Sequence, residues 1–347
     1  MKKFLFLAIA ATAFASCSQD EVMEVAEKQA IQFGESFVGN ATRAIDPSHT
    51  ANNINAFKVW GTLTGNNSAK VNLFNEVLVE RDGKNNGEAF KCAQTEYWVP
   101  NASYNFAAVA NYTSVTAPNG LPETITFNYS DGKTDLLYTK TTNAVTTDAS
   151  ATPSGALKNG IVNFTFDHLL SKLQFRFENN ATSTNHIFRV KNIQISGLPT
   201  KGVYTVGNTT PWAMDSDNAN TGVASFGAAT NATTTSSTTA VDIKKGSPIT
   251  SNDARLVIPN SNTLTITFVK ELYLDANADG KAVDSELIYS DANLTGDKKC
   301  TEITLSNKTF EANGNYVLVV KLTSGNKIEF TVEDLNDWTE ESSVSVN

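Results

Sequence analysis

Along most of the chain from Ala44 onward, apolar and polar residues alternate with a period of two. This alternation is typical of β-strands, because successive side chains of a strand point to opposite faces of its sheet. Clusters of Gly, Asn, Pro and Ser separate the alternating segments and indicate turns. The pattern predicts an all-β protein built from β-sandwiches. The expected strands lie at 57–60, 97–100, 104–110, 124–127, 188–195, 255–259, 264–269, 316–322 and 328–332. Residues 71–73 and 77–79 are expected to form a hairpin, and 162–166 and 173–177 two strands joined by a compact bend.

Two stretches depart from this pattern. Residues 135–140 are the one short piece of the first half that we expect to be helical, and residues 219–240, rich in Thr, Ala and Ser, are expected to form a long surface loop. A length of 347 residues is sufficient for two domains. Because a new series of alternating segments begins near Gly160, we expect an N-terminal sandwich at 44–159 and a C-terminal sandwich at 160–347.

The first residues read as a secretory signal. Two lysines precede an apolar run at 4–15, which is too short to span a bilayer. Phe14-Ala15-Ser16-Cys17 resembles the bacterial lipoprotein box, with Phe in place of the usual Leu. A diacylglycerol and an amide-linked acyl chain on Cys17 would supply two membrane anchors. We therefore expect a lipoprotein signal peptide at 1–17, export, and a lipid anchor in the outer membrane; an ordinary signal peptide that contains a cysteine is the alternative.

A strand followed by a protease-accessible hinge comes next. Ile31 and Phe33 alternate with polar residues, which favours a strand that presses apolar side chains into a sheet. The following residues are small, polar or turn-forming, and they contain one basic residue, Arg43. A trypsin-like protease needs a long cation on an exposed loop, so we expect cleavage between Arg43 and Ala44. Residues 18–43 would then be a propeptide that carries a removable strand; an Arg in a solvated linker is the alternative.

Five short motifs follow one another along the whole chain. They are Ala41-Thr42-Arg43-Ala44, Phe57-Lys58-Val59-Trp60-Gly61, Tyr97-Trp98-Val99-Pro100 followed by Phe106-Ala107-Ala108, Phe166-Asp167-His168-Leu169-Leu170-Ser171-Lys172-Leu173, and Asn336-Asp337-Trp338. No one motif is decisive, but their order resembles that of the fimbrillin family, the major and minor pilins of type V pili.

The resemblance implies two transthyretin-like β-sandwich domains in tandem and export as a lipoprotein to the outer surface. It further implies that an arginine-specific protease removes the N-terminal strand, and that a strand from the C-terminal region of a neighbouring pilin subunit replaces it. Physical reasoning agrees, because a sandwich that lacks one strand exposes apolar side chains and unpaired backbone groups. The tail at 339–347 is expected to be a flexible donor strand, although Val344 and Val346 are its only apolar residues after Trp338. Donation that also needs residues 328–332, an accessory subunit and a frayed terminus are the alternatives.

Residues 275–286 fit the twelve-residue calcium loop. Oxygen-bearing side chains stand at positions one, three and five, a glycine at six and a glutamate at twelve. The flanking segments are expected to be strands rather than the helices of an EF-hand, so a structural turn is the alternative. No other metal or cofactor is expected. The ligands would be Asp275, Asn277, Asp279, the backbone of Lys281, and Glu286.

Composition and motifs argue against several other functions. A formal net charge of −9 is unsuited to binding nucleic acid. His49, His168 and His186 accompany no nucleophile motif and no metal-ligand spacing, so we do not expect an enzyme. Cys92 and Cys300 could pair in an oxidising compartment or remain free thiols, and the sequence leaves both open.

Two functions fit these features. The first is a structural pilin that is cleaved after Arg43 and polymerises by strand exchange into a surface pilus for adhesion. The second is a surface-anchored carbohydrate-binding lipoprotein, in which exposed tryptophans would stack on sugar rings. For each tryptophan, packing in the core is the alternative. The four residues concerned are Trp60, Trp98, Trp212 and Trp338.

Overall fold

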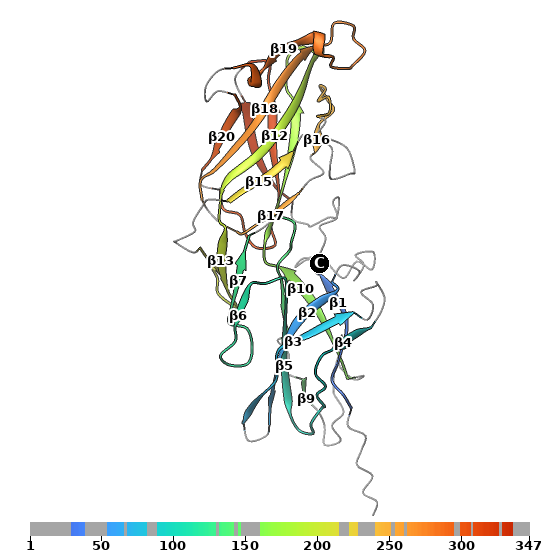
Figure 1. Cartoon of the computed structure of the whole chain (residues 1–347), viewed down its shortest axis with the longest axis vertical. Coiled ribbons are helices and arrows are strands. Elements are labelled where there is room, and N and C mark those ends of the chain that lie inside the picture. Colours follow the sequence, from blue (N-terminus) through green and yellow to red (C-terminus); the bar gives the residue numbers. More distant parts are fainter. Residues whose placement is uncertain are drawn as a thin grey trace, which may run out of the picture.

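The fold is almost entirely β. The computed structural model describes residues 29–38, 54–65, 68–81, 89–129, 132–141, 145–146, 160–214, 222–227, 240–250, 254–259, 262–294, 299–306, 308–325 and 328–335. Within these residues the helical elements are short 3-10 turns, η5 (Asp284–Glu286) and η6 (Asp291–Asn293). The molecule is elongated, with β1 to β5 in its lower part and β18 to β20 in its upper part (Figure 1). The predicted all-β class is confirmed.

The lower part is built on a mixed sheet in which every pairing is antiparallel except the first. Apolar side chains from one face of this sheet, including Phe57, Phe74 and Phe106, form a buried cluster. In spatial order the strands are β1 (Gln32–Val38), β10 (Ile161–His168), β8 (Leu137–Lys140), β5 (Ser103–Ala110), β2 (Ala56–Thr64), β3 (Lys70–Arg81) and β4 (Phe90–Cys92), and β9 (Val145–Thr146) pairs with β5.

A small sheet joins strands from both halves of the sequence. Its order is β14 (Trp212–Met214), β13 (Lys201–Thr205), β7 (Thr124–Asn128) and β6 (Ser114–Thr116). Strand pairing therefore crosses the predicted domain boundary at 159/160, because β10 and β13 follow that boundary and pair with β8 and β7, which precede it. Trp60 from the first half and Leu256 from the second lie in one buried cluster. The division into domains at this residue stays a prediction.

The upper part consists of two sheets that share one core. Phe175 and Phe177 of one sheet meet Phe226 and Phe268 of the other, with ring centroids 4.8 and 5.8 Å apart. One sheet has the order β16 (Ile249–Thr250), β11 (Ser171–Asn179), β21 (Asn315–Leu322) and β22 (Ile328–Leu335), with β17 (Arg255–Val257) also on β11. The other has the order β15 (Gly222–Gly227), β12 (His186–Leu198), β18 (Leu264–Leu274) and β19 (Leu287–Ser290), with β20 (Thr301–Leu305) also on β18.

Two local predictions are wrong. Residues 137–140 of the predicted helix form β8, because their backbone pairs with β5 and β10 and Leu137 is fully buried. Part of the predicted loop at 219–240 is β15, whose Ala224 and Phe226 alternate into the upper core. In both cases tertiary pairing outweighed local composition. Among the described residues, none of the helical segments has the length and apolar character needed to cross a membrane.

Candidate functional site: the β1-binding surface

β1 lies at the outer position of the lower sheet, next to a strand far away in sequence. It runs parallel to β10, with Gln32 opposite Ile161, Phe33 opposite Val162, and a bulge before Ser36. Figure 1 shows β1 and β10 side by side in the lower part of the molecule. An outer strand is bonded to the sheet along one side, so it is the member of a sheet that leaves most easily.

The beginning of β1 is also held from its other side. The Ile31 N–H donates to the Glu96 carbonyl at 2.8 Å, and the Trp98 N–H donates to the Gln29 carbonyl at 3.0 Å. On the β10 side, the Gln32 N–H donates to the Gly160 carbonyl at 3.2 Å. Because β1 also contacts β4, the sheet curls until its two outer strands meet. We call β10, Gly160 and the segment from Glu96 to Trp98 the β1-binding surface.

The side chains at the start of β1 belong to the core. Ile31 is 3% exposed and Phe33 is 4% exposed. The Phe33 ring stacks on Phe164 at 5.8 Å and meets the edges of Phe74 and Phe106 at 5.4 and 6.1 Å. The strand therefore fills space in the centre of the lower cluster, and its removal would expose aromatic rings to water.

Two glycines permit the close approach of β1. Gly160 has a positive φ of 73°, a conformation that L side chains rarely adopt, and a β-carbon there would collide with the side chain of Gln29. A β-carbon at Gly34 would collide with the side chains of Ile161 and Asn163 on β10. The β1-binding surface is thus shaped closely to this strand.

The predicted processing sites lie outside the described residues. These are the lipidation site Cys17, the cleavage pair Arg43 and Ala44, and the tail that contains Trp338. Their roles stay predictions. The last residue of β1 is Val38, and in the sequence the predicted cut at Arg43 comes five residues after it. A cut at Arg43 would therefore separate β1 from the rest of the chain.

The predicted calcium loop forms a turn closed by its own hydrogen bonds. The Asp275 carboxylate is 5% exposed and accepts from the Asp279 and Gly280 N–H groups at 3.1 and 2.8 Å. The Glu286 carboxylate accepts from the Ala276 N–H at 3.2 Å, and Asp279 accepts from the Lys281 N–H at 2.8 Å. No group of three or more His, Cys, Asp or Glu side chains in the described part of the chain is arranged to hold a metal. Calcium binding by this loop stays a prediction.

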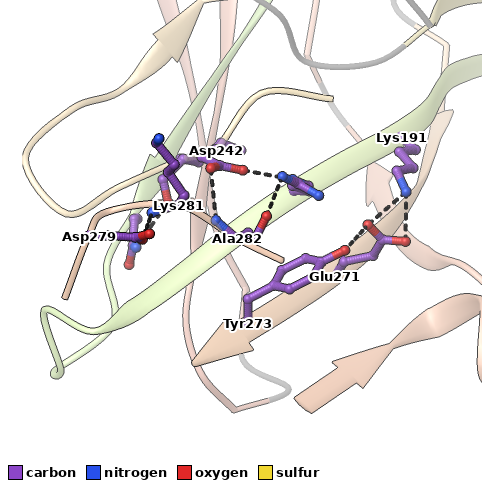
Figure 2. A network of polar contacts seen from close by, with 10 residues as sticks. Lys191, Asp242, Glu271, Tyr273, Asp279, Lys281 and Ala282 are labelled. Atoms are coloured by element: carbon purple, nitrogen blue, oxygen red, sulfur yellow. Dashed lines mark hydrogen bonds and ion pairs between the residues drawn. The ribbon is translucent and has the colours of Figure 1, made fainter. Parts of the chain in front are cut away.

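A polar network anchors the end of this turn to the upper sheet (Figure 2). Asp242 accepts from Arg189 Nε at 2.7 Å and from the Ala282 N–H at 2.9 Å. Arg189 also donates to the Ala282 carbonyl at 2.7 Å. Beside it, the Glu271 carboxylate accepts from Lys191 and from the Tyr273 hydroxyl, both at 2.9 Å. These contacts explain the order of the turn without any ligand.

Each of the two histidines in the described residues contacts a polar side chain, and the two cysteines there are not bonded to each other. His168 Nδ1 contacts the buried Asp135 carboxylate at 2.5 Å, and His186 Nδ1 contacts the Ser324 hydroxyl at 2.6 Å. Cys92 and Cys300 are both free thiols. Burial raises the pKa of each thiol, which lowers the fraction of reactive thiolate. His49 lies outside the described residues.

The described tryptophans that were candidates for stacking on sugars are buried or partly buried in the protein. Trp60 and Trp98 are each 1% exposed and lie in the core. Trp212 is partly buried and donates its indole N–H to the Leu169 carbonyl at 2.9 Å. Trp338 is outside the described residues. The core alternative is therefore confirmed for Trp60 and Trp98.

Sequence reasoning identified β1 but missed most of what holds it. The alternating run of β10 was visible, whereas its parallel pairing with β1 was not. The sequence predicts the end of an ordinary strand at 97–100, whereas in the structure Trp98 and the neighbouring Glu96 bond to the residues just before β1. Gly160 was read as the start of a new domain. A glycine directly before an apolar alternating strand was the available sign of a close approach.

The arrangement of the sheets is similar to that of proteins of known structure. The structure is similar to that of a fimbrial protein from Bacteroides vulgatus, with a TM-score of 0.59 at 17% identity, over 88% of this chain and 98% of that chain. The tip fimbrial protein Mfa3 from Porphyromonas gingivalis, with a C-terminal truncation, gives a TM-score of 0.41 at 10% identity, over 90% of this chain and 100% of that chain. At 17% identity, the likeness to the Bacteroides vulgatus protein shows the fold alone.

The sequence assigns the family. A family model described as fimbrillin-like matches residues 42–338. The chain belongs to the fimbrillin-like family. A comparison with curated proteins gave no match.

Proposed function

We propose that this chain is a structural pilin subunit. It is exported as a lipoprotein, cut after Arg43, and joined to other pilin subunits by head-to-tail strand exchange into a surface pilus for adhesion. Its family and its fold support a fimbrial role at the cell surface. The observation that carries the exchange step is the position of β1, which is an outer strand with core side chains and a chain segment behind it that contains the predicted cut.

The free energy that holds β1 is substantial, and a strand that replaces β1 can recover it. Burial of Ile31 and Phe33 contributes roughly 1.5–3 kcal/mol each before ordering costs. The β-ladder to β10 and the bonds to Glu96 and Trp98 add to this. If β1 left, the exposed rings and unpaired backbone groups would favour any strand that could restore them.

The proposed contact propagates because its two sides differ. The acceptor is the β1-binding surface, and the donor is the C-terminal region of a neighbour. In this chain that region follows β22, which pairs with β21 at the end of its sheet. A contact between unlike surfaces does not close on itself, so it builds a fibre. A cut at Arg43 would also release the body from the lipid on Cys17 and allow it to enter the fibre.

A cleavage experiment tests the proposal. The protein beginning at residue 18 is incubated with a limiting dose of trypsin in the presence of a fluorescent peptide of residues 29–39, and it is followed on boiled and unboiled gels. We expect one early cut after Arg43, followed by a boil-sensitive band in which the cut protein carries the peptide. The Arg43→Ala variant should show neither the cut nor the labelled band. A protein that is cut after Arg43 and takes up no peptide would contradict strand exchange.

A further inference from the structure

The space around β1 restricts which strand can replace it. Phe33 occupies a site formed by the rings of Phe74, Phe106 and Phe164, and it is 4% exposed. The sizes of these surrounding groups match an aromatic ring. A smaller side chain in the same place would leave an unfilled cavity, and unfilled cavities weaken packing.

The next position on β1 limits the size of the side chain that a replacement strand can carry there. Gly34 has no side chain, and a β-carbon at this position would overlap the Ile161 and Asn163 side chains of β10. The bulge between Phe33 and Ser36 lies at the same point of the ladder. Asn163 is flexible, whereas the overlapping methyl group of Ile161 sits close to its own backbone. Any larger residue directly after the aromatic must therefore displace β10 side chains or change register.

The C-terminal segment of this chain does not meet the two requirements together. From residue 326 to the end it contains no glycine. Its aromatic residues, Phe330 and Trp338, are each followed by threonine, which carries two heavy atoms on its β-carbon. The last alternating pair, Val344 and Val346, is too small to fill the space of a phenylalanine ring.

We propose that the β1-binding surface selects a strand in which an aromatic residue is followed directly by glycine, and that its occupant in the fibre comes from a different kind of subunit rather than from the tail of a second copy. This inference rests on the proposed function and specifies the partner of its acceptor side. This chain then donates its own tail to an acceptor of another shape. The subunit is a member of a mixed fibre and does not polymerise efficiently with itself.

A strand-displacement experiment tests this inference on the full chain from residue 18. A site for a sequence-specific protease replaces residues 40–44, and the folded protein is cut at this site. A fluorescent peptide of residues 29–39 is then bound to the cut protein. Unlabelled peptides compete with it, and the loss of bound fluorescence measures their affinity. We expect the wild-type peptide of residues 29–39 to compete. Peptides with Gly34→Val or Phe33→Val should bind at least about tenfold more weakly.

Two controls make the result specific. The exposed Gln32 is changed to Val in a matched peptide, which should bind like wild type because its side chain faces solvent. An Ile161→Ala protein should recover most of the binding lost by the Gly34→Val peptide, because the overlapping methyl group is gone. A peptide of residues 336–347, which represents a second copy as donor, should fail to compete.

The outcomes separate this inference from the proposed function. Equal binding of the Gly34→Val and wild-type peptides would overturn the inference and leave strand exchange intact. Effective competition by the 336–347 peptide would do the same and assign the occupant to a second copy. Failure of the wild-type peptide to bind at all would mean that β1 is not replaceable, and it would overturn the proposed function together with the inference.

Discussion

Replacement of Phe33 by alanine tests the contribution of β1 to the uncut protein. Truncation of a buried phenylalanine costs about 3–5 kcal/mol, and the ring contacts with Phe74 and Phe164 place Phe33 in that range. Because β1 is an outer strand near the chain terminus, most of this loss should appear as easier local detachment of the strand. About 3 kcal/mol corresponds to a rise of roughly a hundredfold in the opening equilibrium.

Hydrogen exchange measures this opening directly. The Ile31 and Gln32 amides donate to Glu96 and Gly160, and the Trp98 amide donates to Gln29, so all three should exchange faster in Phe33→Ala. Amides of β11 and β21 in the upper part should not change. Gln32→Ala, at an exposed position, serves as the matched control. Unchanged protection of these three amides in Phe33→Ala would show that Phe33 does not hold β1, and the reasoning about the β1-binding surface would be refuted.

Three further outcomes follow from other sites. Gly160→Ala should lower the free energy of unfolding by about 1–3 kcal/mol in denaturant titrations, because alanine disfavours its positive φ and would meet Gln29; no loss would contradict the close approach. Burial lowers the pKa of Lys270, opposed by Asp291, so the folded state binds this proton less tightly than the unfolded state. The free energy of unfolding should therefore increase with pH between the lowered pKa of Lys270 in the folded state and the ordinary lysine pKa of the unfolded state. This increase should be present in wild type and absent in Lys270→Met when both are unfolded in denaturant across alkaline pH. Asp275→Ala should cost about 1.5–3 kcal/mol by removing two charge-assisted bonds, seen as a lower melting temperature; in wild type, absence of both heat and thermal shift at millimolar calcium would remove the calcium hypothesis.

The all-β fold was predictable because strand periodicity is a local property. Val162, Phe164 and Phe166 alternate in sequence and all point into the core of the structure. The failure at 137–140 has the complementary cause. Those residues carry little strand pattern of their own, and they are extended because β5 and β10 lie on either side of them. A property set by distant neighbours is not visible in a short window of sequence.

The candidate site was predictable only in part for the same reason. Ile31 and Phe33 identified a strand that buries apolar side chains, and the structure confirms their burial. The partners of that strand lie about 65 and 130 residues further along the chain, and no local pattern links them. The predicted calcium loop has the spacing of calcium ligands, and in the structure the Asp275 carboxylate accepts hydrogen bonds from backbone amides of its own turn. Spacing alone does not distinguish an Asp that closes a turn from an Asp that binds calcium.

The sheet formed by β6, β7, β13 and β14 has a mechanical consequence. Because β13 follows the upper strands β11 and β12 in sequence but pairs with β7 below, the polypeptide passes from the lower part to the upper part and back before it ends. A load that stretches the molecule along its length must break the ladder between β7 and β13 before the two parts can separate. A subunit under tension at the cell surface would therefore resist extension as one mechanical unit rather than as two independently moving domains.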